Sequence, residues 1–334
     1  MDTLLEITNL YTSFFTPAGE VRAVRDVSLS LRRGEVLGIV GESGSGKSVT
    51  MLSILRLLGT SGRVVGGNIR FDGMELAEAD DETVAHLRGN RIGMIFQDPM
   101  TSLNPVLSVG YQLMEPLIRH RGMTKTQARE RAIEMLRHVG ICPAEKRIDQ
   151  YPHQFSGGQR QRIMIAMAMT CDPALLIADE PTTALDVTIQ AQILELMKAL
   201  QARTGTSIIL ITHDLGVIAG MADRVVVMYG GRIVERGTRK DIFYAPGHPY
   251  TKGLLHSVPN PDTLVRERLV PIEGQPPDLL NPPPGCPFAA RCPETMRVCM
   301  ELPPEPTSLS EGHVATCWLH DRRCARSVAG GACA

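Results

Sequence analysis

The sequence has little net charge and no long apolar run. Its 334 residues include 35 lysines and arginines against 36 aspartates and glutamates, so charge gives no argument for nucleic acid as a partner. Apolar runs such as Ile208–Ile211 and Val225–Met228 are far shorter than the ~18 residues that a membrane helix needs. The first residues, MDTLLEITNL, lack the basic start and apolar core of a signal peptide. We therefore expect a cytosolic chain without a membrane span of its own.

Cysteine is scarce over most of the chain and crowded at its end. Six of the eight cysteines lie at or beyond residue 286, and 13 of the 23 prolines lie from Pro259 onward. Because a cytosolic chain seldom keeps disulfides, this crowding indicates a metal or cluster site, or merely tolerated thiols. It also predicts a boundary near residue 259, beyond which the chain is expected to be extended and loop-rich.

Apolar runs alternate with helical patterns through the first 258 residues. Strands are predicted within residues 1–40 and at 91–96, 175–178, 207–212 and 224–229, and helices at 48–58, 123–139, 160–169 and 187–201. Strands separated by helices predict an α/β fold around a largely parallel sheet. A helix-rich stretch of roughly 100–165 interrupts this pattern and is expected to form its own lobe.

A phosphate-binding loop is predicted at residues 41–48. Their sequence, GESGSGKS, matches G-x-x-x-x-G-K-[ST] and lies between an apolar strand and a helix. Glycines let backbone N–H groups approach phosphates, and the helix N-terminus attracts their charge. Lys47 would reach the β- and γ-phosphates of ATP, and the Ser48 hydroxyl would coordinate Mg²⁺. The predicted loop residues at this site are Gly41, Ser43, Gly44, Gly46, Lys47 and Ser48.

Two acids end the apolar run at residues 175–178. Asp179 at the end of a strand beside a phosphate loop can hold Mg²⁺ directly or through water. Glu180 could then polarise the water that attacks the nucleotide. By themselves the two acids would indicate only a solvent-exposed end of a strand. Together with the phosphate loop they predict a catalytic pair.

A second anion-binding element is predicted at residues 156–159, SGGQ, which lead directly into a helix. One nucleotide does not need two such helix ends. At this point residues 4–255 resemble the ATP-binding subunits of ABC transporters, whose signature is LSGGQ, with Phe155 in place of the leucine. The resemblance implies a P-loop NTPase (RecA-like) core with an inserted helical subdomain. It also implies that Ser156, Gly157, Gly158 and Gln159 contact ATP.

The resemblance implies three further site residues. Gln97 resembles the Q-loop glutamine, which contacts Mg²⁺ and the water and couples to the membrane subunits. Asp186 lies in a segment that resembles the D-loop, with Thr183 where serine is commoner. His213 resembles the switch histidine that contacts the γ-phosphate, although a lone histidine at a strand end is more often structural.

The resemblance also implies a head-to-tail pair of ATPase subunits. Each ATP would lie between the phosphate loop of one chain and the signature helix of the other. The adenine-stacking aromatic is expected among Tyr11, Phe14 and Phe15, of which Phe14 best matches the family spacing.

Two further motifs resemble one branch of the family. Residues 94–105, MIFQDPMTSLNP, and 247–255, GHPYTKGLL, resemble the oligopeptide/dipeptide/nickel importer ATPases. This implies ATP hydrolysis coupled to uptake of dipeptides or oligopeptides at the cytoplasmic face of the membrane. The implied partners are a second ATPase subunit, identical or related, two transmembrane permease subunits and, indirectly, an extracytoplasmic solute-binding protein.

The sequence motifs leave alternatives to peptide import open. Nickel or glutathione could be the solute, since the ATPase subunit does not touch it. A soluble ABC-type ATPase of DNA repair or of ribosomes is disfavoured because those usually carry two cassettes or a coiled coil. A scaffold that only binds ATP is disfavoured because Lys47, Asp179, Glu180 and His213 are all present.

Four of the crowded cysteines form a spaced set, Cys286-x5-Cys292-x6-Cys299-x17-Cys317. The spacing lacks CxxC pairs and leaves zinc, an iron–sulfur cluster and reduced thiols open. Residues 285–293, GCPFAARCP, resemble the C-terminal segment of the importer branch, which implies that these cysteines bind a [4Fe–4S] cluster, with zinc as the alternative. Cys324 and Cys333 fall outside the pattern. The expected division is an ABC ATPase domain at 1–258 and a C-terminal module at 259–334.

Overall fold

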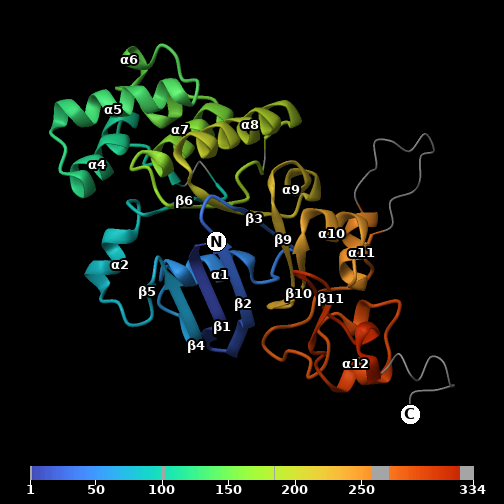
Figure 1. Cartoon of the computed structure of the whole chain (residues 1–334). Coiled ribbons are helices and arrows are strands. Elements are labelled where there is room, and N and C mark those ends of the chain that lie inside the picture. Colours follow the sequence, from blue (N-terminus) through green and yellow to red (C-terminus); the bar gives the residue numbers. More distant parts are fainter. Residues whose placement is uncertain (1, 99–101, 184, 258–270, 324–334) are drawn as a thin grey trace, which may run out of the picture. The chain divides into compact units, whose positions relative to one another are not determined.

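The computed structural model describes residues 2–98, 102–183, 185–257 and 271–323 (Figure 1). The chain separates into two compact units. The first comprises the described residues within 1–4, 31–36 and 78–211, and the second those within 5–30, 37–77 and 212–334. The domain boundary predicted at 258/259 lies outside the described residues. Among the described helices, none is long and apolar enough to span a membrane.

Three parallel strands pair with one another in the first unit. They are β6 (Ile92–Ile95), β7 (Leu175–Asp179) and β8 (Ser207–Thr212), paired at Ile92↔Leu175 and Leu175↔Ser207. Every residue of β7 and β8 is buried. Near-continuous apolar runs fit a parallel sheet covered on both faces, and the α/β fold class is confirmed.

Helices make up much of the rest of the first unit, drawn in Figure 1 from cyan (α2) through green to yellow-green (α8). They are α2 (Asp81–Leu87), α4 (Val109–Arg121), α5 (Lys125–His138), α6 (Ala144–Arg147), α7 (Gly157–Met169) and α8 (Val187–Thr204). Thr124 and Gln127 cap the start of α5 reciprocally, which fixes where the predicted 123–139 helix begins. Gly122, in a left-handed conformation, ends α4.

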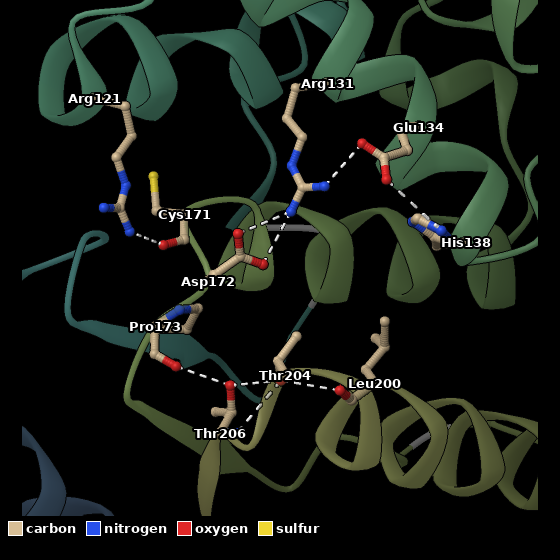
Figure 2. Close-up of polar contacts among 10 residues, drawn as sticks. All are labelled: Arg121, Arg131, Glu134, His138, Cys171, Asp172, Pro173, Leu200, Thr204 and Thr206. Atoms are coloured by element: carbon tan, nitrogen blue, oxygen red, sulfur yellow. Dashed lines mark hydrogen bonds and ion pairs between the residues drawn. The ribbon is translucent and has the colours of Figure 1, made fainter.

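Ion pairs join α5 to the turn that precedes β7 (Figure 2). Arg131 Nη2 lies 2.9 Å from each carboxylate oxygen of Asp172, and its Nη1 lies 2.8 Å from Glu134 Oε2. Arg121 donates to the Cys171 carbonyl in the same turn. These contacts fix the start of the strand whose far end carries the predicted catalytic acids.

An antiparallel sheet opens the second unit. Its strand order is β2 (Gly19–Arg32), β1 (Thr3–Thr16), β4 (Gly62–Phe71) and β5 (Met74–Glu75). β1 pairs with β4 from Leu5↔Phe71 to Phe14↔Gly62. The sequence pattern predicts strands within residues 1–40 but not this separate sheet, because most of β4 is exposed and shows no buried alternation.

The second unit also contains parallel and antiparallel strand pairs. β3 (Val36–Val40) lies parallel to β9 (Arg224–Tyr229), and β10 (Arg232–Thr238) lies antiparallel to β9. The helices here are α1 (Lys47–Ile54), α9 (Leu215–Met221), α10 (Arg239–Tyr244), α11 (Pro249–His256) and α12 (Arg297–Glu301). α1 is shorter than the predicted 48–58 helix. It stops because Arg56 adopts a left-handed conformation, with φ of 50°, and donates to the Leu76 carbonyl.

The proline-rich tail is more regular than predicted. A hairpin of β11 (Pro306–Ser310) and β12 (His313–Thr316) pairs with β10 through Glu235↔Ala315. The fully buried Glu235 carboxylate accepts hydrogen bonds from the backbone N–H groups of Gly247 and His248 and from His313 Nε2, at 2.7–2.9 Å. The prediction of an extended, loop-rich tail is therefore wrong for residues 306–316, whose strands are too short to show a periodic pattern.

Candidate functional site

The predicted phosphate loop connects β3 to α1 and depends on its glycines. Gly41 has φ of 152° and Gly46 has φ of 97°. A Cβ atom on Gly41 would lie 2.2 Å from the Met228 carbonyl oxygen, and one on Gly46 would lie 2.6 Å from that of Ala23. Any side chain at either position would force the loop open, so the motif glycines are required by shape.

Lys47 is held inside this loop. Its side chain is buried, and Nζ donates to the carbonyl oxygens of Gly41 (2.7 Å) and Glu42 (2.8 Å). Lys47 is also the first residue of α1, where the helix N-terminus adds partial positive charge. A buried ammonium and a helix N-terminus in one loop favour an anionic ligand such as phosphate.

The predicted acids lie in the first unit, at the end of β7. Asp179 is 7% exposed, and Glu180 follows it with a left-handed φ of 48°. Glu180 Oε2 accepts hydrogen bonds from Gln97 Nε2 (3.1 Å) and Thr183 Oγ1 (2.8 Å). The structure thus brings together the predicted Q-loop glutamine and the predicted base. The Gln97 and Thr183 bonds set the direction of the Glu180 carboxylate.

The signature residues begin α7 in the first unit. Ser156 Oγ accepts from the Gln159 N–H, and Gln159 Oε1 accepts from the Ser156 N–H, which makes a capping box. A Cβ on Gly157 would meet nothing within 4 Å, whereas one on Gly158 would lie 2.9 Å from Ile189 of α8. The absence of a side chain at Gly158 therefore lets α7 pack closely against α8. At Gly157 it leaves the N-terminus of α7 open to approach.

Asp186 caps α8, with Oδ1 accepting from the Ile189 N–H at 2.9 Å. Capping of the helix N-terminus is therefore a structural reason for an aspartate at this position. Two segments of the predicted motifs lie outside the described residues, 99–101 of the Q-loop run and Ala184 of the D-loop, and so do Cys324 and Cys333.

The remaining predicted nucleotide contacts lie in the second unit. His213 follows β8 and is exposed. On β1, Phe14 is half-buried opposite Gly62, while Tyr11 is 39% and Phe15 is 49% exposed. Burial does not rank the three aromatics as adenine contacts, so the choice of Phe14 stays a prediction.

The structure brings the four predicted tail cysteines to one small cavity, which His248 and Phe288 also line. Cys286, Cys299 and Cys317 are buried, and burial raises the pKa of Cys286 to about 11 and that of Cys317 to about 12. Within the described chain, no group of three His, Cys, Asp or Glu residues could hold a single metal ion. We call residues 286–317 the cysteine module.

Sequence reasoning missed two residues that touch the phosphate loop from far along the chain. Tyr250 of α11 and Arg291 of the cysteine module both contact Glu42. A single sequence contains no signal for either contact, because 208 and 249 residues separate the partners.

Comparisons with known proteins match both parts of the chain. Residues 24–183 match the ABC transporter family, and residues 234–299 match the oligopeptide/dipeptide transporter C-terminal region. The dipeptide transport ATP-binding protein DppD of Bacillus subtilis (strain 168) is 58% identical over 99% of both chains. The oligopeptide transport ATP-binding protein OppD of Salmonella typhimurium (strain LT2) is 53% identical over 95% of this chain and 94% of that protein.

A solved structure agrees with this assignment. The dimeric post-hydrolysis state of the ATP-binding cassette MJ0796, bound to ADP and Pi, matches with a TM-score of 0.64 and 29% identity. The match covers 71% of this chain and 99% of the solved one. Full-length identity to relatives and the two family regions agree with the motifs at residues 41–48 and 156–159. The chain belongs to the ATP-binding subunits of ABC transporters, in their oligopeptide/dipeptide branch, and it is an ATPase.

Proposed function

We propose that this ATPase drives uptake of dipeptides or oligopeptides. The observation that carries the proposal is the 58% identity to a dipeptide transport protein over nearly the whole of both chains. The C-terminal match at residues 234–299, to a region named for oligopeptide and dipeptide transporters, supports it independently. Both favour peptide transport over nickel or glutathione import and over a soluble role in DNA repair or on ribosomes.

The proposed assembly places this chain at the cytoplasmic face of the inner membrane. It would pair head to tail with a second ATPase subunit and bind two permease subunits, which receive solute from an extracytoplasmic binding protein. The dimeric state of the solved MJ0796 cassette supports the pairing. The open approach at Gly157 on α7 suits a nucleotide held by the other subunit's phosphate loop.

The proposed roles divide binding from chemistry. Lys47 and the N–H groups of residues 41–48 bind the phosphates, with Phe14 against the adenine. Ser48, Asp179 and Gln97 would hold Mg²⁺, which supplies positive charge to the β- and γ-phosphate oxygens.

Glu180 is the proposed base. It accepts a proton from the water that attacks the γ-phosphorus, while the bond from that phosphorus to the β–γ bridging oxygen breaks to release ADP and phosphate. His213 contacts the γ-phosphate. Ser156, Gly157, Gly158 and Gln159 would bind the ATP of the other subunit, and Asp186 would connect the two sites.

Uptake measurements test the transport proposal. A strain lacking its own peptide importer ATPases, supplied with this chain together with permease and solute-binding subunits of a dipeptide transporter, should take up a labelled dipeptide. The Lys47→Ala variant of this chain, expressed to the same level, should take up none. Uptake of nickel or glutathione without any peptide uptake would contradict the proposed substrate.

We further propose that Cys286, Cys292, Cys299 and Cys317 bind a [4Fe–4S] cluster. The zinc alternative does not fit, because no three His, Cys, Asp or Glu side chains among the described residues could hold a single metal ion. Support comes from four cysteine side chains that line one cavity of a short segment. Each cysteine of such a cluster binds a different iron, so its sulfurs lie farther apart than the ligands of one metal ion. When bound, the cluster would staple the module and add stability that a short segment cannot obtain from packing.

Metal analysis of the full chain purified without oxygen tests this assignment. We expect a brown protein with stoichiometric iron and sulfide. Cys286→Ser should lose most of both, whereas Cys142→Ser, a cysteine outside the module, should keep them. Stoichiometric zinc with no iron would contradict the cluster.

A further inference from the structure

One side chain of the cysteine module reaches the phosphate loop within the second unit. Arg291 directly precedes Cys292, and its guanidinium forms a two-pronged ion pair with Glu42, the second residue of the loop. Arg291 Nη1 lies 2.6 Å from Glu42 Oε2, and Nη2 lies 3.1 Å from Oε1. The Arg291 side chain is 6% exposed and that of Glu42 is 26% exposed. The arginine side of the pair is therefore shielded from solvent. Two parallel charge-assisted hydrogen bonds of this kind are stronger than neutral ones and hold the two side chains in one geometry.

Every donor of Arg291 has an acceptor in the protein. Besides its two bonds to Glu42, Nη1 donates to Tyr229 Oη (3.1 Å), Nη2 to the Ile272 carbonyl (2.9 Å) and Nε to the Glu273 carbonyl (2.8 Å). A guanidinium has five N–H donors, and all five are used here. Arg291 is thus built to hold Glu42 rather than to bind a nucleotide phosphate directly.

A second contact holds Glu42 by its backbone. The Glu42 N–H donates to Tyr250 Oη at 2.8 Å. The Tyr250 ring is fully buried and packs against Tyr229, at 4.5 Å between ring centroids, and against Phe288 of the cysteine module, at 5.3 Å. Both ends of Glu42 are therefore fixed by residues from 229–291, far along the chain from the loop.

A carboxylate in this loop has an electrostatic consequence. Glu42 places a negative charge beside the N–H groups that are to receive a triphosphate, and like charges at close range repel. Pairing with Arg291 cancels that charge and turns the carboxylate toward the module. Without the arginine, the negative charge of this carboxylate would partly offset the positive charge that Lys47 offers to phosphate, since Lys47 Nζ already donates to the Glu42 backbone carbonyl.

We propose that Arg291 is a positioning residue for ATP binding, which neutralises and holds Glu42 so that the folded cysteine module sets the nucleotide affinity of the phosphate loop. The inference rests on the phosphate-binding role proposed above for residues 41–48. Arg291 acts only through Glu42 and touches no reacting atom.

A set of four variants tests the proposal by equilibrium titration of the full chain with a fluorescent ATP analogue. Arg291→Ala should raise the Kd about 5- to 50-fold, in the usual range of coupling between two sites. Glu42→Gln, which removes the repelling charge, should bind ATP as tightly as the parent or more tightly. The double variant should recover most of the loss, and Arg291→Lys, a point charge without the fork, should fall between.

The double variant separates the proposal from a purely structural role. If Arg291 only supports folding of the module, the double variant binds no better than Arg291→Ala, and the proposal is overturned. If Arg291→Ala fails to fold, the Kd for ATP of Arg291→Lys is compared with that of the Arg291→Lys and Glu42→Gln double variant instead. Arg297→Ala, an exposed arginine of the same module with its side chain 80% exposed, is the matched control and should bind ATP normally.

Hydrogen exchange gives an independent readout, because coupling between sites is reciprocal. ATP should slow amide exchange over residues 286–299 in the parent chain and leave it unchanged in Arg291→Ala. The Lys47→Ala variant distinguishes the role of Arg291 from the phosphate-binding role of the loop. Loss of binding in Lys47→Ala with normal binding in Arg291→Ala would refute only the role of Arg291. Normal binding in both would refute the phosphate-binding role of the loop itself.

Discussion

Replacing Glu180 with glutamine is expected to lower the ATP hydrolysis rate by about 10²- to 10⁴-fold, the range that a positioned general base contributes. The amide keeps the size of the side chain and an oxygen that can accept from Gln97 and Thr183, but it cannot take the proton of the attacking water. ATP binding should change little, because Glu180 is proposed to act on the water and not on the phosphates. Steady-state phosphate release and equilibrium ATP titration on the same preparation measure the two effects.

Glu195→Gln is the matched control for Glu180→Gln. Glu195 lies on α8 with its side chain 75% exposed, and it pairs with Lys198 at 3.3 Å. Its replacement should leave both hydrolysis and binding unchanged. A Glu180→Gln protein that binds ATP and hydrolyses it at the parental rate would show that another group is the base.

Replacing Lys47 with alanine should abolish measurable ATP binding, and hydrolysis with it. A hydrogen bond to a charged group is worth about 1.5–3 kcal/mol, so two lost bonds to phosphate weaken binding by roughly 100-fold or more. The same substitution leaves the Gly41 and Glu42 carbonyls without the ammonium that they share, which loosens the loop. Isothermal titration of the full chain with ATP and Mg²⁺ measures the loss.

The control for Lys47→Ala is Lys198→Ala, a lysine on α8 with its side chain 42% exposed. Both variants should show the far-ultraviolet circular dichroism of the parent. Lys47→Ala protein with normal ATP affinity would be incompatible with the proposed site.

Much of the parallel core could be predicted because its strands are continuous apolar runs. Residues 175–179 and 207–212 are buried throughout. Short continuous apolar runs of this kind are typical of strands in a parallel sheet that is covered on both faces. The loop at 41–48 was equally predictable, since Gly41 and Gly46 lie where backbone contacts leave no room for a side chain.

The features that sequence reasoning missed depend on distant contacts. β4 is mostly exposed and carries Gly66 and Gly67, so its place in a sheet comes from pairing with β1 and not from a pattern of its own. α1 ends early because Arg56 finds an acceptor at Leu76, twenty residues away. Arg291 lies in the motif at residues 285–293, but nothing in the sequence indicates that the fold brings it to Glu42.

The hairpin of β11 and β12 has a consequence for solubility. By pairing with β10, β12 covers backbone N–H and C=O groups that would otherwise line an open sheet edge and invite strands of other molecules. The outer strand, β11, is only five residues long and begins with Pro306, which has no N–H to offer. A cassette cut before residue 306 would therefore expose an edge that pairs readily between molecules. We therefore expect the hairpin to lower the tendency of the ATPase to aggregate.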